Sequence, residues 1–127
     1  MAGSRLMEEF MQMTCPHTLN AMQHLVMAMA DFQKNAGKKT FFGRDKGVKS
    51  YQNFLQKLRD MLHAMILDRL ITEATPTEKV NAEILSKIDL FSRAFPNWHD
   101  AYTFAEYYFR TNQDEAIATL ERLRGAA

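Results

Sequence analysis

The chain has few of the residues that cross-link, break or anchor a protein. Its 127 residues include one cysteine, three prolines and five glycines. A single cysteine excludes an internal disulfide framework and fits a reducing compartment. The longest apolar run, Leu25 to Ala30, has six residues, far fewer than the roughly 20 that a membrane-spanning helix needs. We therefore expect no membrane contact and a cytoplasmic location.

The spacing of the apolar residues predicts the fold class. Apolar side chains recur at intervals of three and four almost everywhere, and no segment alternates cleanly, which favours helices throughout. At this length we expect a single domain over 1–127 with its own core. The predicted fold is all-α: a bundle of about four to six helices, with a long central helix at about 47–73 and one irregular basic loop at 36–46.

Capping signals predict where several helices begin. Helices are expected over about 4–13 and 16–35. Thr75-Pro76-Thr77-Glu78 predicts a further start, in which Thr75 is the cap and Glu78 completes a capping box. Asn97, with an acid three residues later, predicts the start of the next helix.

Basic residues are concentrated in one segment. Residues 34–59 hold eight of the sixteen Lys and Arg residues and one acid, Asp45, a formal charge of +7 in a chain whose total is +1. Positive charge with interleaved aromatic rings is the combination that binds single-stranded nucleic acid. This segment is the alternative site, for nucleic acid or another anionic ligand, with these residues: Lys34, Lys38, Lys39, Phe41, Phe42, Arg44, Lys46 and Lys49.

Methionine is concentrated at the N-terminus. Seven of the nine methionines lie in the first 29 residues, and Met7 and Met11 fall on the predicted first helix. Methionine side chains are flexible, so a Met-rich helix adapts to a partner helix. A ten-residue helix is marginal alone and must dock on something. Met7 and Met11 are therefore predicted to contact a partner protein.

The segment 97–110 is apolar on nearly every side. A helix of this kind is central in a fold or is shared with a partner. Tyrosine and tryptophan are also enriched at protein interfaces. We predict partner contacts for four aromatic residues: Trp98, Tyr102, Tyr107 and Tyr108.

No enzyme motif is complete. His99-Asp100 with His63 would suit metal-dependent hydrolysis, but that chemistry needs a further aspartate well downstream, and only 27 residues follow Asp100. Arg59 and His63 resemble the Arg-x4–6-His motif of HEPN ribonucleases, with three intervening residues instead of four to six. Residues 98–123 resemble one tetratricopeptide unit without its turn glycine, which implies generic helix-pair packing. We expect no catalytic residue, no cofactor and no metal site.

These observations favour a non-catalytic helical module that binds another protein. An adaptor, a chaperone-like protein, an inhibitor or immunity-type protein, and a subunit of a homo-oligomer all fit this description. The expected partner is another protein or a second copy of the chain, and a dimer is the expected form of self-association. Nucleic acid is the alternative partner.

Overall fold

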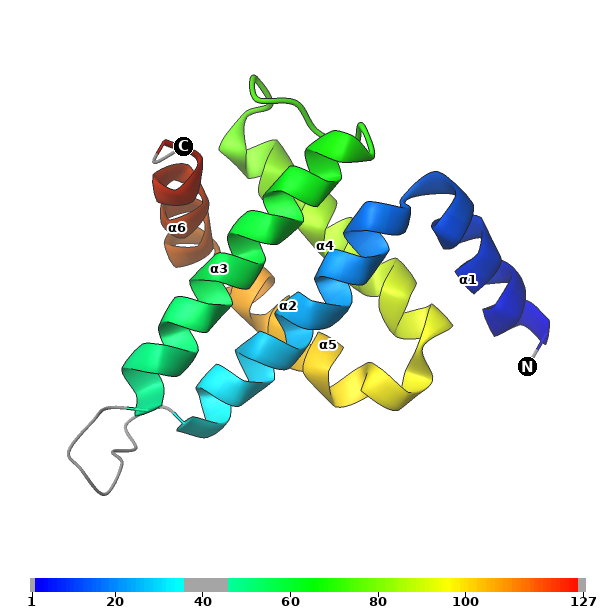
Figure 1. Cartoon of the computed structure of the whole chain (residues 1–127), viewed down its shortest axis with the longest axis horizontal. Helices are drawn as coiled ribbons and strands as arrows, with labels where there is room; N and C mark the ends of the chain where they lie inside the picture. Colours follow the sequence, from blue (N-terminus) through cyan, green and yellow to red (C-terminus); the bar gives the residue numbers. More distant parts are fainter. Residues whose placement is uncertain (1, 36–45, 126–127) are drawn as a thin grey trace.

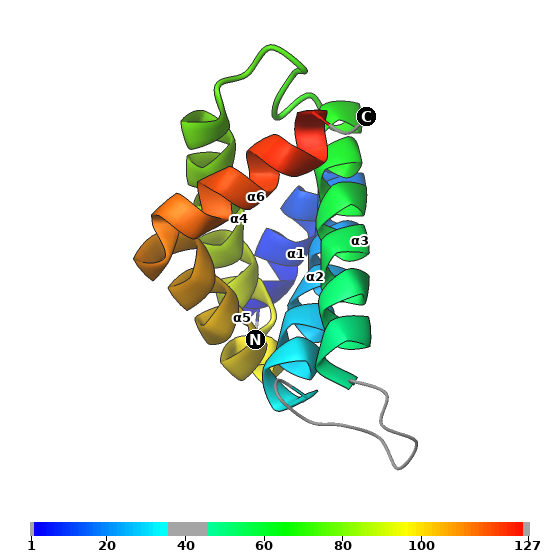
Figure 2. The ribbon, with the colours of Figure 1, turned by 90° about the vertical axis from the view of Figure 1, so that its left-hand side faces the viewer.

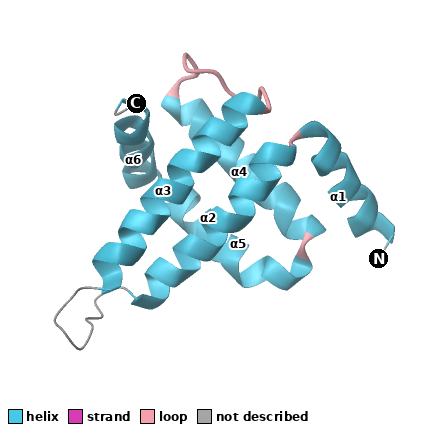
Figure 3. Cartoon of the chain, in the orientation of Figure 1, coloured by secondary structure: helices cyan, strands magenta, loops and turns pink. Residues whose placement is uncertain are grey.

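The computed structural model describes residues 2–35 and 46–125, and this part of the chain is helical apart from short connections (Figure 3). It contains six α-helices and no strand, which confirms the predicted all-α bundle. The helices are α1 (Ala2–Thr14), α2 (Pro16–Asn35), α3 (Lys46–Leu67), α4 (Thr77–Ala94), α5 (His99–Glu106) and α6 (Gln113–Gly125). A 3-10 turn, η1 (Pro96–Trp98), precedes α5, and a π-helical turn, η2 (Tyr107–Thr111), follows it.

The helices form two layers. The helices α2 and α3 pack side by side in opposite directions, and α4, α5 and α6 cover one face of this pair (Figures 1 and 2). Helix α1 lies at the margin, in contact with α2 and α4. None of the described helices is long and apolar enough to cross a membrane.

Large apolar side chains fill the space between the layers. Phe54 of α3, Phe91 of α4, Tyr102 of α5 and Phe109 of η2 are all fully buried. Burying one such side chain contributes about 1.5–3 kcal/mol, so these four rings are a major part of what holds the layers together. Burial also raises the pKa of the Tyr102 hydroxyl.

The long helix α3 ends earlier than predicted, at Leu67 instead of about residue 73. Arg69 has a positive φ of 62°. The Leu70 N–H donates to the Met65 carbonyl at 2.9 Å and the Arg69 N–H to the Ile66 carbonyl at 3.0 Å, the two bonds of a Schellman ending. The sequence does not indicate this ending, because an arginine occupies the position where glycine is usual and the apolar pattern continues into the next turn.

Asp68, at the end of α3, caps the start of α2. Its carboxylate accepts hydrogen bonds from the backbone N–H of Thr18 at 2.6 Å and of His17 at 3.4 Å. These N–H groups lie in the first turn of α2, where no intrahelical acceptor exists. Pro16, the first residue of α2, has no N–H to satisfy. The cap therefore ties two segments that are 50 residues apart.

Two predicted caps are wrong. Pro76 precedes α4, and no side chain caps that helix. Thr75 instead accepts a hydrogen bond at its hydroxyl from the Thr72 N–H at 2.8 Å, so it stabilises the preceding turn. Trp98, not Asn97, precedes α5, because the 3-10 turn η1 leads directly into that helix.

We predict that Asp68→Ala lowers the free energy of unfolding by about 1–2 kcal/mol, because it leaves two N–H groups of α2 without their acceptor. Urea denaturation followed by circular dichroism measures the change. Asp60→Ala is the matched control, since Asp60 lies on α3 and, within the described residues, its carboxylate bonds only the exposed Gln56. Equal losses in the two variants would contradict the capping role.

Candidate functional site

The most exposed apolar surface of a single helix lies on α1. Leu6, Phe10 and Met13 occur at intervals of four and three residues, so they form one stripe along the helix. Their exposed fractions are 66%, 63% and 84%. Three of the eight exposed large hydrophobic residues in the described chain thus belong to one 13-residue helix. This stripe is called the outer face of α1 below.

A neighbouring side of α1 docks on the bundle. Met11 is buried in the core and Met7 is half-buried against it. Cys15, the single residue between α1 and α2, is buried as well. The two methionines predicted from the sequence therefore hold α1 in place, and the exposed residues beside them were missed.

The predicted aromatic residues are distributed between core and surface. Tyr102 is buried, Trp98 and Tyr108 are half-buried, and Tyr107 is 55% exposed. The Tyr108 ring packs edge-on against Phe54 with centroids 5.5 Å apart, and its hydroxyl donates to the Thr119 hydroxyl at 3.3 Å. Of the four, Tyr107 has the geometry of a residue free to contact a partner.

The π-helical turn that carries Tyr107 is supported from α4. Such a turn breaks the regular hydrogen-bond ladder of the helix. The side-chain amide of Asn81, which is buried, donates to the Phe109 carbonyl at 3.0 Å. The Asn81 amide oxygen and the Tyr102 hydroxyl have no hydrogen-bond partner among the described residues. The hydrogen bond between Asn81 and the Phe109 carbonyl fixes the turn that positions Tyr107.

Only part of the predicted basic segment can be placed. Lys38, Lys39, Phe41, Phe42 and Arg44 lie outside the described residues.

Lys34, Lys46 and Lys49 are exposed. The Asn35 amide donates to the Ser50 hydroxyl at 3.1 Å, which joins the end of α2 to the start of α3. The three lysines are therefore at the same end of the bundle. Binding of nucleic acid there remains a prediction.

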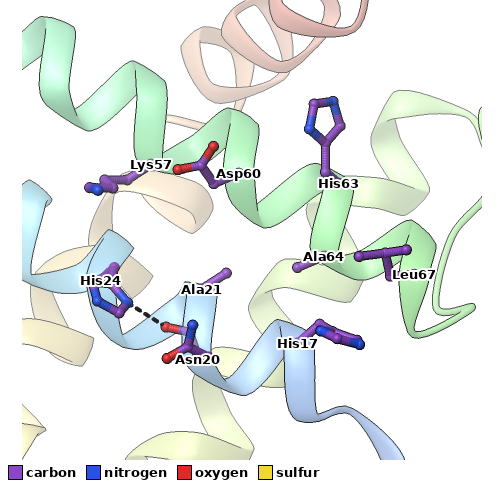
Figure 4. A pocket seen from close by; sticks show the side chains of 9 residues that line it. All are labelled: His17, Asn20, Ala21, His24, Lys57, Asp60, His63, Ala64 and Leu67. Carbon is purple, nitrogen blue, oxygen red and sulfur yellow. Dashed lines mark hydrogen bonds between the residues drawn. The ribbon is translucent and has the colours of Figure 1, made fainter.

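A polar groove of about 360 Å³ lies between α2 and α3 (Figure 4). His17, His24, Lys57, Asp60 and His63 line it over the small side chains Ala21 and Ala64. The His63 ring points away from α2, while the His24 Nδ1–H donates to the Asn20 carbonyl of its own helix at 2.8 Å. The imidazoles thus do not converge. Within the described ranges no group of three or more His, Cys, Asp or Glu side chains is placed to hold a metal ion.

A second, smaller cavity of about 230 Å³ lies where α3, the connector 68–76 and α6 meet. Arg59, His63, Glu73 and Arg124 stand around it. Its other lining residues are apolar: Leu62, Ile66, Ile71 and Leu123. The residues come from three segments that are distant in the sequence, so no local pattern indicates this cavity.

Cys15 reports whether α1 is docked. Burial raises the pKa of the Cys15 thiol, against a smaller lowering effect of the hydrogen bond from Thr14. We predict that Cys15 reacts with a thiol reagent at least about a hundredfold more slowly in the native protein than in urea, because it is buried and less of it is thiolate.

The rate at which Cys15 reacts also distinguishes the docked side of α1 from its outer face. Met11→Ala should increase the rate in the native protein, since it removes the side chain that anchors α1 beside Cys15. Phe10→Ala, which changes only the outer face, should leave the rate unaltered. An increased reaction rate in Phe10→Ala, or an unchanged rate in Met11→Ala, would contradict this placement of α1.

Comparisons with known proteins give no relative. The chain matches no protein-family model, no curated protein and no solved structure. Its function must therefore be inferred from its own surfaces.

Proposed function

We propose that the chain is a non-catalytic protein-binding module that self-associates through the outer face of α1. The observation that carries the proposal is the exposed stripe of Leu6, Phe10 and Met13. Contiguous exposed apolar side chains on a helix are characteristic of interaction surfaces, and phenylalanine and methionine are enriched in them. The occupant that we propose is α1 of a second copy.

The stripe is complementary to itself. In a two-fold symmetric dimer the same surface is used by both subunits. When two copies of α1 pack in opposite directions, Phe10 meets Phe10 near the axis and Leu6 of each copy lies opposite Met13 of the other. The helix is about 20 Å long at 1.5 Å per residue, so the three side chains occupy most of one face.

The position of α1 leaves room for a second copy. It lies at the margin of the bundle, and its main contacts with the described elements are with α2 and α4 (Figure 1). A second α1 can approach the outer face without displacing another part of the fold. The ion pair between Arg5 and Glu9, which are both exposed, lies on the same helix and is compatible with a polar rim.

The expected dimer is weak. Each stripe residue is about two-thirds exposed or more, so burying the six side chains of two copies contributes about 6–12 kcal/mol. Association costs about 4–15 kcal/mol in lost freedom of motion. At most about 8 kcal/mol remains, so the dissociation constant is micromolar at the tightest.

Sedimentation velocity over a range of protein concentrations tests the proposal. We predict that the sedimentation coefficient rises with concentration in the parent protein and that Phe10→Asp stays monomeric, because the dimer would bury an unpaired charge. Gln12→Asp adds the same charge at an exposed position away from the stripe and should dimerise like the parent. A parent protein that is monomeric throughout, or a Phe10→Asp variant that still dimerises, would refute self-association through this face.

A further inference from the structure

We propose that the cavity between α3, the connector 68–76 and α6 binds a small monocarboxylate that carries an apolar body. This ligand site is spatially separate from the outer face of α1, because α1 and α6 lie on opposite sides of the molecule (Figure 1). The proposal rests on the shape of the cavity and on the two guanidinium groups beside it.

The cavity has an apolar floor and a charged rim. Leu62, Ile71 and Leu123 are buried, with exposed fractions of 4%, 4% and 6%, and they form the floor. Arg59 and Arg124 are half-buried at the rim, next to the exposed residues His63 and Glu73. A ligand that fills this space would contact hydrocarbon on one side and positive charge on the other.

The positive charges of the rim are not neutralised by ion pairs. Arg59 has no hydrogen bond or ion pair within the described part of the chain, where the four ion pairs all join residues four apart on one helix and involve neither Arg59 nor Arg124. A half-buried charge without a partner is costly, and an anion that pairs with it would offset that cost.

Arg124 is held in place by neutral acceptors. Its guanidinium donates to the Thr77 hydroxyl at 3.1 Å, to the Glu73 carbonyl at 2.9 Å and to the Thr72 carbonyl at 3.4 Å. These oxygens orient the group without cancelling its charge. The connector and α6 therefore present a fixed positive group beside the cavity before any ligand arrives, which lowers the cost of ordering the site on binding.

Charge and size together select the ligand class. Two arginines and one glutamate give the rim a net charge of +1 when His63 is neutral, which matches a monoanion better than a phosphate dianion. The free fork of Arg59 suits a planar carboxylate, with two parallel hydrogen bonds. The volume, about 230 Å³, equals about eight times the share of one liquid water. A chain or ring of about six carbons fits this space.

An NMR titration of the 15N-labelled chain with three ligands of equal tail length tests the charge requirement. The probes are hexanoate, hexan-1-ol and hexylammonium. We predict saturable shifts of the Leu62, Ile71 and Leu123 amide signals with hexanoate, weaker binding of hexan-1-ol and the weakest binding of hexylammonium. No saturable shift with hexanoate at millimolar concentrations, or binding of hexan-1-ol as tight as that of hexanoate, would overturn the proposal.

Two variants test the residues that we assign. Arg59→Gln should weaken hexanoate binding about tenfold, because it removes a charge-assisted hydrogen bond. Glu73→Gln should strengthen it about two- to fivefold, because it removes a repulsive charge from the rim. A gain in affinity cannot result from misfolding, so this variant keeps the test decisive if Arg59→Gln folds poorly. Arg93→Gln, an exposed arginine of α4 that pairs with Asp89, is the matched control, and an effect as large as that of Arg59→Gln would refute the assignment.

Discussion

The hydrogen bonds that the Asp68 carboxylate accepts are the interaction on which the outer face of α1 and the cavity beside α6 both depend. The carboxylate joins the end of α3 to the first turn of α2 by accepting hydrogen bonds from two backbone N–H groups. Cys15 and α1 directly precede that turn, so the cap helps to set where α1 leaves the bundle. On the other side of Asp68, the left-handed Arg69 redirects the chain so that Ile71 and Glu73 reach the cavity beside α6. One junction thus positions the start of α1 and one wall of the cavity.

Helix α1 illustrates how a short helix can be stable and still leave apolar side chains exposed. Its inner side buries Met11 and half-buries Met7, which gives a marginal helix the tertiary contacts that it needs. Its outer side repeats apolar residues at the same spacing but meets no other helix of the described chain. A partner that covers Leu6, Phe10 and Met13 would give α1 a second set of contacts without changing the first.

The sequence predicts best those features whose causes are local. The all-α class and the extent of α2 follow from apolar spacing and a proline at the helix start. The end of α3 was missed because its stop signal is an arginine at a position that normally requires glycine. The inner and outer sides of α1 could not be told apart, because Met7-Met11 and Leu6-Phe10-Met13 are both apolar stripes at helical spacing, and only the packing of α1 on α2 and α4 decides between them. The sequence does not predict the cavity, because Arg59, Glu73 and Arg124 come together only in the folded chain.

The most direct test of the account is an intermolecular paramagnetic relaxation measurement. One sample carries a spin label at Gln12→Cys in a Cys15→Ala background. It is mixed with 15N-labelled protein that carries no spin label. The account predicts that the label on one copy broadens the α1 amide signals of the other copy, at Leu6, Phe10 and Met13, and leaves the signal of Tyr107 unchanged. If no signal broadens at high protein concentration, or if the broadening is centred on another surface, the claim that α1 carries the interface is contradicted.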